Sequence, residues 1–186
     1  LTGGSLSDVL LGGADQDILV GGAGQDILID LDKAKLTGGV SDKTGDDAAD
    51  LFVVRGVESG TADGVTEITD YELGSNTQIY SDRIAFNISV SSLAGTALAA
   101  ITPDGSLAAA DYDKLKSALQ VKVIPETADD DTHFTVQVFV KASASTALTE
   151  DLLVGQTDVS LTGDTKLTAE DRLEYRILDQ EDFLSQ

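Results

Sequence analysis

Short apolar triplets return at a fixed interval at the start of the chain. They occupy residues 9–11, 18–20 and 27–29, and a polar or Gly-rich stretch separates each triplet from the next. A triplet is too short for an α-helix, and its return every nine residues predicts short strands stacked in register. In such a strand the central side chain, here always Leu, points to one face and its two neighbours point to the other.

The repeated blocks share more than their triplets. Gly3–Leu11, Gly12–Val20 and Gly21–Ile29 each have Gly-Gly at positions one and two, Asp at position six and Leu at position eight. A Gly pair tolerates the positive φ angles of a tight turn, which can bring carbonyl oxygens and one carboxylate around one point. Calcium takes six to eight oxygen ligands, so two stacked turns can enclose an ion. Ordinary turns with surface carboxylates do not explain the repetition in register.

These blocks resemble the repeats-in-toxin (RTX) family, whose consensus is G-G-x-G-x-D-x-(large apolar)-x, and Gly21–Ile29 matches it at every fixed position. The resemblance implies a parallel β-roll with calcium in the turns and two nonapeptides in each coil. A turn then faces the turn two blocks later. Position four, usually Gly or Asn, is Leu6 in the first block and Asp15 in the second. The first implied ligand set is Gly4, Leu6 and Asp8 facing Gly21, Ala23, Gly24 and Asp26.

The array is interrupted after the third block. The fixed period places Lys35 where the next Asp should be, so we expect the polar segment Asp30–Thr44 to loop out. The array resumes at Gly45–Val53, with Asp50 at position six. If the segment loops out, this block stacks on the second one. The second implied ligand set is Gly13, Asp15, Asp17, Gly45, Asp47 and Asp50. Together the two sets would hold roughly two calcium ions.

The outward positions of the predicted strands are also apolar. A solvated outer face would be polar, so this pattern predicts that the roll is covered by the rest of the chain, by other copies or by upstream domains. The outward residues are Val9, Leu11, Ile18, Val20, Ile27 and Ile29.

The segment after the array resembles the one that follows RTX repeats in type I secreted proteins. Glu67–Tyr71 and Asp82–Phe86 read as two strands able to close the roll. Asp63, Asp70 and Asp82 could ligate another calcium, but we favour surface or turn-capping roles for them.

The last part of the chain is predicted to be β-rich with one helix. Apolar residues at helical spacing predict an amphipathic helix over Ser106–Leu119, and alternation predicts antiparallel strands. These strands are expected at 121–124, 133–141, 152–154 and 173–178. The predicted fold class is therefore mostly β. A roll over residues 1–56, with a loop inserted at about 30–44, precedes a roll-capping, β-rich unit over 57–186.

Charge and composition restrict the partners. Thirty-three acidic residues against twelve basic ones give a net charge of −21, which repels nucleic acid and anionic lipid, so neither is expected as a partner. No cysteine is present for disulfides or thiolate metal sites. No segment has the ~20 apolar residues of a bilayer span, so we expect no membrane insertion. Packing or bound hard cations must stabilise the fold.

The sequence offers no catalytic residues. The only histidine, His133, begins an alternating strand, where surface placement is the more common outcome. Nucleophile-elbow, zinc-protease and phosphate-loop motifs do not occur. The acidic pairs at Glu170–Asp171 and Asp129–Asp131 lie in polar runs, which lack the apolar pocket that catalytic carboxylates need. We expect any catalysis to lie upstream, because the chain begins inside a motif and reads as a piece of a longer protein.

The resemblance implies a secreted or cell-surface protein of a Gram-negative-type bacterium, exported unfolded by a type I secretion apparatus and folding on calcium. Three functions fit. The first is a C-terminal module for calcium-dependent folding, secretion and stability. The second is a structural or adhesive part of a surface-layer protein or biofilm adhesin. The third is an accessory module of a secreted protease, lipase or polysaccharide epimerase.

Overall fold

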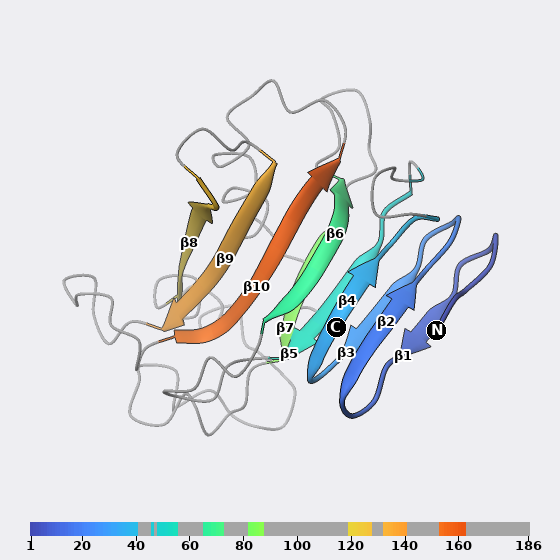
Figure 1. Cartoon of the computed structure of the whole chain (residues 1–186), viewed down its shortest axis with the longest axis horizontal. Helices are drawn as coiled ribbons and strands as arrows, with labels where there is room; N and C mark the ends of the chain where they lie inside the picture. Colours follow the sequence, from blue (N-terminus) through green and yellow to red (C-terminus); the bar gives the residue numbers. More distant parts are fainter. Residues whose placement is uncertain are drawn as a thin grey trace, which may run out of the picture.

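The computed structural model describes residues 1–40, 46, 48–55, 65–72, 82–87, 119–127, 132–140 and 153–162. This part of the chain is mostly strand and contains no helix, which confirms the predicted mostly-β class (Figure 1). The strands are β1 (Val9–Leu11), β2 (Gln16–Val20), β3 (Ile27–Asp30), β4 (Lys33–Thr37), β5 (Leu51–Arg55), β6 (Thr66–Glu72), β7 (Arg83–Asn87), β8 (Leu119–Pro125), β9 (His133–Val140) and β10 (Leu153–Thr162). The expected helix, up to residue 118, and the expected strand 173–178 lie outside the described residues.

The first seven strands alternate between two sheets, and β8, β9 and β10 all belong to the second. The first sheet has the order β1-β3-β5-β7 and is parallel throughout. The second has the order β2-β4-β6-β10-β9-β8, in which β10 runs parallel to β6 and β9 runs antiparallel to both β10 and β8. Because each coil gives one strand to each sheet, the first seven strands form the expected parallel β-roll.

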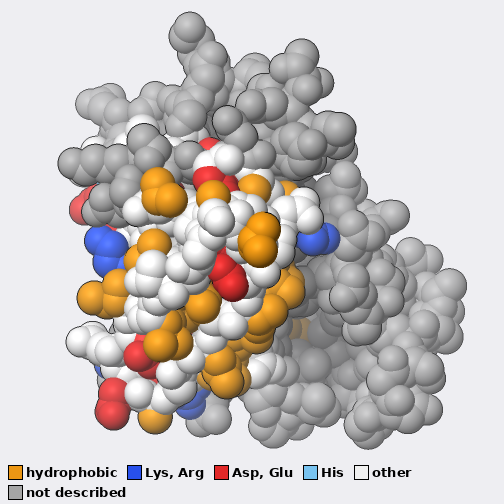
Figure 2. Space-filling model, turned by 90° about the vertical axis from the view of Figure 1, so that its right-hand side faces the viewer, with side chains coloured by type: hydrophobic (Ala, Val, Ile, Leu, Met, Phe, Trp, Pro, Cys, Tyr) orange, Lys and Arg blue, Asp and Glu red, His pale blue; other side chains and the backbone are white. Residues whose placement is uncertain are grey.

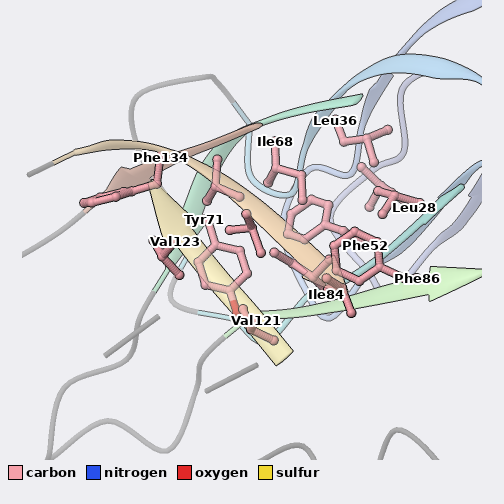
Figure 3. Packing of buried hydrophobic residues seen from close by; sticks show 14 of the residues in the cluster. Leu28, Leu36, Phe52, Ile68, Tyr71, Ile84, Phe86, Val121, Val123 and Phe134 are labelled. Carbon is pink, nitrogen blue, oxygen red and sulfur yellow. The ribbon is translucent and has the colours of Figure 1, made fainter. Parts of the chain in front are cut away.

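The centre of the roll is filled by the residues predicted to point inward. Leu19 and Leu28, at position eight of their blocks, are 0% exposed. The same hydrophobic cluster continues through Phe52 and Tyr71, whose ring centroids are 6.3 Å apart, to Val121 on β8 (Figure 3). The described C-terminal strands therefore share both a sheet and a core with the roll, although the division at residue 57 stays a prediction.

Strand β4 lies inside the segment that was expected to loop out, and for residues 33–37 that expectation is wrong. Val9 pairs with Ile27, eighteen residues on, whereas Gln16 pairs with Lys33, seventeen residues on. The turn before β4 is thus one residue shorter than the turn before β2. This deletion puts Ala34, and not Lys35, beside Asp17, and it lets Leu36 enter the core at 0% exposure.

Strand β10 is much longer than the sequence indicated. The apolar run predicted only residues 152–154, but pairing with both β6 and β9 extends the strand to Thr162. The missed residues alternate, with Thr157, Val159 and Leu161 buried and polar neighbours only partly buried. A half-buried strand with Thr and Gly among its inward positions gives a weak hydrophobic signal.

The apolar outer positions lie partly in the open. Val9, Leu11 and Ile18 are 67%, 61% and 63% exposed, while Val20, Ile27 and Ile29 are partly buried. In the first sheet this apolar face continues onto β5, because Ile27 lies beside Leu51 and Ile29 beside Val53. Figure 2 shows the face of the molecule at the β1 and β2 end, with hydrophobic side chains spread across it. Coverage of this face by a partner stays a prediction. Among the described residues no helix is long and apolar enough to span a bilayer.

Candidate metal centre

Four aspartates stack in a column where the chain enters the first sheet. Asp8, Asp26, Asp50 and Asp82 directly precede β1, β3, β5 and β7. The backbone N–H of Asp8 donates to Oδ1 of Asp26 at 2.7 Å, that of Asp26 to Oδ1 of Asp50 at 2.7 Å, and that of Asp50 to Oδ1 of Asp82 at 2.9 Å. We call these four residues the aspartate ladder. The carboxylates of Asp26, Asp50 and Asp82 thereby each hold the preceding turn in register.

The structure brings the first predicted ligand set together. Ala23 donates its N–H to the carbonyl oxygen of Gly4 at 3.0 Å. The turn of the third block lies so close to that of the first that a Cβ on Gly24 would be 3.0 Å from the carbonyl carbon of Leu6. Gly24 has a φ of +107°, which an L side chain rarely adopts, so its consensus glycine is required here. Asp8 and Asp26 are joined by a hydrogen bond of the aspartate ladder. Gly21 lies in the same turn as Ala23.

The second predicted ligand set is not brought together. Asp50 stacks on Asp26, since Leu51 donates its N–H to the carbonyl oxygen of Asp26 at 2.9 Å, and the predicted grouping of Asp50 with Gly13, Asp15 and Asp17 is wrong. The cause is β4, which occupies the place beside β2 that the Gly45–Val53 block was expected to take. Gly45 and Asp47 lie outside the described residues.

The glycine pair that belongs with Asp50 is Gly38–Gly39. Gly21 donates its N–H to the carbonyl oxygen of Thr37 at 2.8 Å, and Gly22 donates its N–H to the carbonyl oxygen of Gly38 at 2.9 Å. Gly38–Gly39 therefore stacks on the glycine pair of the third block. A Cβ on Gly38 would collide with Oδ2 of Asp50. The repeat is thus split, with its glycines and its aspartate separated by an insertion. The Gly-Gly pair itself was the available signal, but a search at fixed spacing passes over it.

Unpartnered oxygens distinguish candidate ligands from structural aspartates. Asp17, Asp26 and Asp30 each have a buried Oδ2 with no hydrogen-bond partner. A buried carboxylate oxygen without a donor is costly unless a cation neutralises it. The residues present therefore fit a bound cation at these turns.

Asp70 and Asp82 have a different environment. Asp70 accepts from the N–H groups of Gly38 at 2.8 Å and Gly39 at 2.7 Å. Oδ1 of Asp82 accepts from the backbone N–H of Asp50, and its Oδ2 accepts from the backbone N–H of Glu72 at 2.8 Å. Both oxygens of each carboxylate accept from backbone N–H groups, as the favoured turn-capping role predicts. The surface alternative is wrong, because Asp70 and Asp82 are buried. Asp63 lies outside the described residues.

The buried carboxylates resist ionisation in the absence of a cation. Burial is the largest cause and raises the pKa of Asp50 to about 7, with the charges of Asp46 and Asp26 adding to it. Burial likewise raises the pKa of Asp70 to about 6 and that of Asp26 above its usual range. A divalent cation next to these groups would reverse the effect, because it favours the charged form.

The turns before β2 and β4 form a second column. Asp15 donates its N–H to Oδ2 of Asp32 at 3.2 Å, and it has a φ of 70°, in the left-handed region that Asp tolerates better than most residues. Gly13 has a φ of +119° in the same turn. No group of three or more acidic or imidazole side chains suited to a metal occurs in the described ranges. Any ion in these turns would therefore take many of its ligands from backbone carbonyls, which calcium accepts readily.

Comparison with known proteins agrees with this geometry. A family model described as RTX calcium-binding nonapeptide repeat (4 copies) matches residues 1–29. No curated protein and no solved structure matches the chain.

Proposed function

Residues 1–29 form an RTX calcium-binding region, and from this premise we propose that the chain is a module for calcium-dependent folding, secretion and stability in a type I secreted extracellular protein. The observation that supports it best is Asp26. This residue is 1% exposed, its Oδ2 has no hydrogen-bond partner, and it lies in the middle of a column of carboxylates.

Calcium would supply folding free energy at this column. The whole chain carries a net charge of −21, and the ladder places several of these charges one above another in a buried position. Self-repulsion of this kind opposes compaction, and neutralisation by a bound cation removes it. Because the stacked turns exist only in the folded chain, binding free energy becomes folding free energy.

The same coupling supports a role in secretion. Extracellular calcium modules bind at roughly 10⁻⁴ to 10⁻³ M, so their sites are empty in the cytosol and filled outside the cell. The chain would then stay extended during export through a type I apparatus and fold on arrival. Catalysis, if the full protein has any, would lie upstream.

Replacement of Asp26 by Asn tests the function at the residue level. The amide keeps an oxygen for the N–H of Asp8 but removes the charge, so we expect the calcium midpoint of folding, followed by circular dichroism, to rise about tenfold or more. In chelator the variant should be at least as stable as the parent, because a desolvated charge is gone. Glu67→Gln, an exposed residue on β6, is the control for loss of one charge. Equal calcium midpoints for D26N and the parent would argue against the proposal.

A structural or adhesive role is the second candidate, and the apolar outer face of the first sheet favours it. With Val9 and Leu11 well exposed, this face would bury apolar area against other copies. Sedimentation velocity in calcium should then show association that Leu11→Lys weakens about tenfold. Ile18→Lys, on the outer face of the second sheet, should leave it unchanged. If the chain stays monomeric in calcium at protein concentrations up to ~1 mM, this candidate is excluded.

A further inference from the structure

Asp30 occupies a place where the repeats have glycine. The register of β1 and β3 aligns Gly12 with the residue that follows Ile29, which is Asp30. The side chain shares the inward face of β3 with Leu28, and the residue is 0% exposed. A carboxylate therefore enters the inside of the turn column, where the consensus has no side chain.

The oxygens of Asp30 and Asp17 converge on one point. Oδ1 of Asp30 accepts from the N–H of Asp32 at 2.9 Å, whereas Oδ2 is buried and unpartnered, as is Oδ2 of Asp17. A Cβ built on Gly12 would collide with Oδ2 of Asp30 and would lie 3.0 Å from Oδ2 of Asp17. Two carboxylates thus face each other above a glycine, with no donor to either free oxygen.

The carboxylate of Asp30 also replaces a position-six aspartate that is missing from the second column of turns, the column before β2 and β4. In the first column each turn keeps its position-six aspartate, but in the second column Asp17 has Ala34 beside it. The shortened turn is still joined to the second block, because Asp32 accepts from the N–H of Asp15. The pair of turns therefore keeps two inward carboxylates, one supplied from position six and the other from position one.

We propose that Asp17 and Asp30 bind a calcium ion between the second block and the shortened turn at residues 30–32, a site that the repeat consensus does not encode. The proposal rests on the proposed function in that calcium is the ion. Only oxygen ligands are offered, two carboxylates neutralise a divalent charge, and neighbouring carbonyls can complete the shell. Zinc prefers nitrogen and sulfur ligands, and magnesium demands a more rigid octahedron.

The test counts calcium ions bound to the full chain at saturating calcium, by equilibrium dialysis with metal analysis. Asp30→Asn should bind one calcium fewer than the parent. Asp17→Asn should lose the same ion, and the double variant should lose no further one. Glu67→Gln should bind the full number.

A second measurement separates ligation from a structural role. In chelator, D30N should be at least as stable as the parent, since removal of one of two facing charges relieves repulsion. A D30N variant that folds and binds the full number of ions would overturn the proposal, and so would a D17N variant with the full number. If the parent binds no calcium, the proposed function itself fails. If D26N lowers the count and D30N does not, only this inference fails.

Discussion

Chelation of calcium should lower the melting temperature of the whole chain by about 10–20 °C or leave it unfolded at room temperature. A site filled at one hundred times its Kd contributes about 2.7 kcal/mol, so two sites contribute about 5 kcal/mol. For a chain of this size each kcal/mol shifts Tm by about 2–4 °C. The signal to follow is strand content by circular dichroism during a calcium titration.

This experiment also tests how far the calcium turns are coupled to the C-terminal strands. Since β10 pairs with β6 and Val121 and Phe134 belong to the same core as Leu28, we expect one transition and not two. Magnesium at equal ionic strength is the control for screening of the negative charge, and it should restore little of the stability. The central conclusion does not hold if strand content and Tm are the same in calcium and in chelator.

Acidification should stabilise the calcium-free chain, opposite to the usual acid response. Asp50, with a pKa of about 7 in the fold, and Asp70, with one of about 6, have an ordinary pKa of 3.8. At pH values between 3.8 and these raised pKa values, the folded chain binds more protons than the unfolded chain. The free energy of unfolding therefore falls as pH rises through this window and is highest below it. At 1.36 kcal/mol for each pKa unit, Asp50 alone could contribute up to about 4 kcal/mol.

Calcium should reverse this pH dependence, because protons compete with the ion for the candidate ligand carboxylates, such as that of Asp26. Melting temperatures measured from pH 7.5 to 5 should rise on acidification in chelator and fall in calcium, so that the two profiles converge. Asp50→Asn should flatten the profile in chelator. This result would separate the contribution of Asp50 from the general relief of charge repulsion that acidification brings. A parent chain whose Tm in chelator drops between pH 7.5 and 5 would contradict the assignment of Asp50 as a desolvated acid.

The sequence by itself determined the local unit of this protein. The nine-residue period, the turn glycines and the inward leucines are properties of adjacent residues, so they predicted the β-roll and the facing turns of Asp8 and Asp26. Alternation in the same way predicted the strands observed as β8 and β9. These signals are strong because each strand of the roll buries one face and each calcium-type turn requires glycine.

The tertiary structure alone decided which turns stack on one another. A one-residue deletion before β4 and an insertion between Gly38–Gly39 and Asp50 both break the fixed period, and counting along the chain cannot resolve them. The register is set instead by the core, where Leu36 must be buried beside Leu19, and by backbone hydrogen bonds between distant turns. Whether an aspartate is a capping group or a candidate ligand also depends on these turns, because distant N–H groups satisfy Asp70 and Asp82 and leave Oδ2 of Asp26 and Asp30 without a partner.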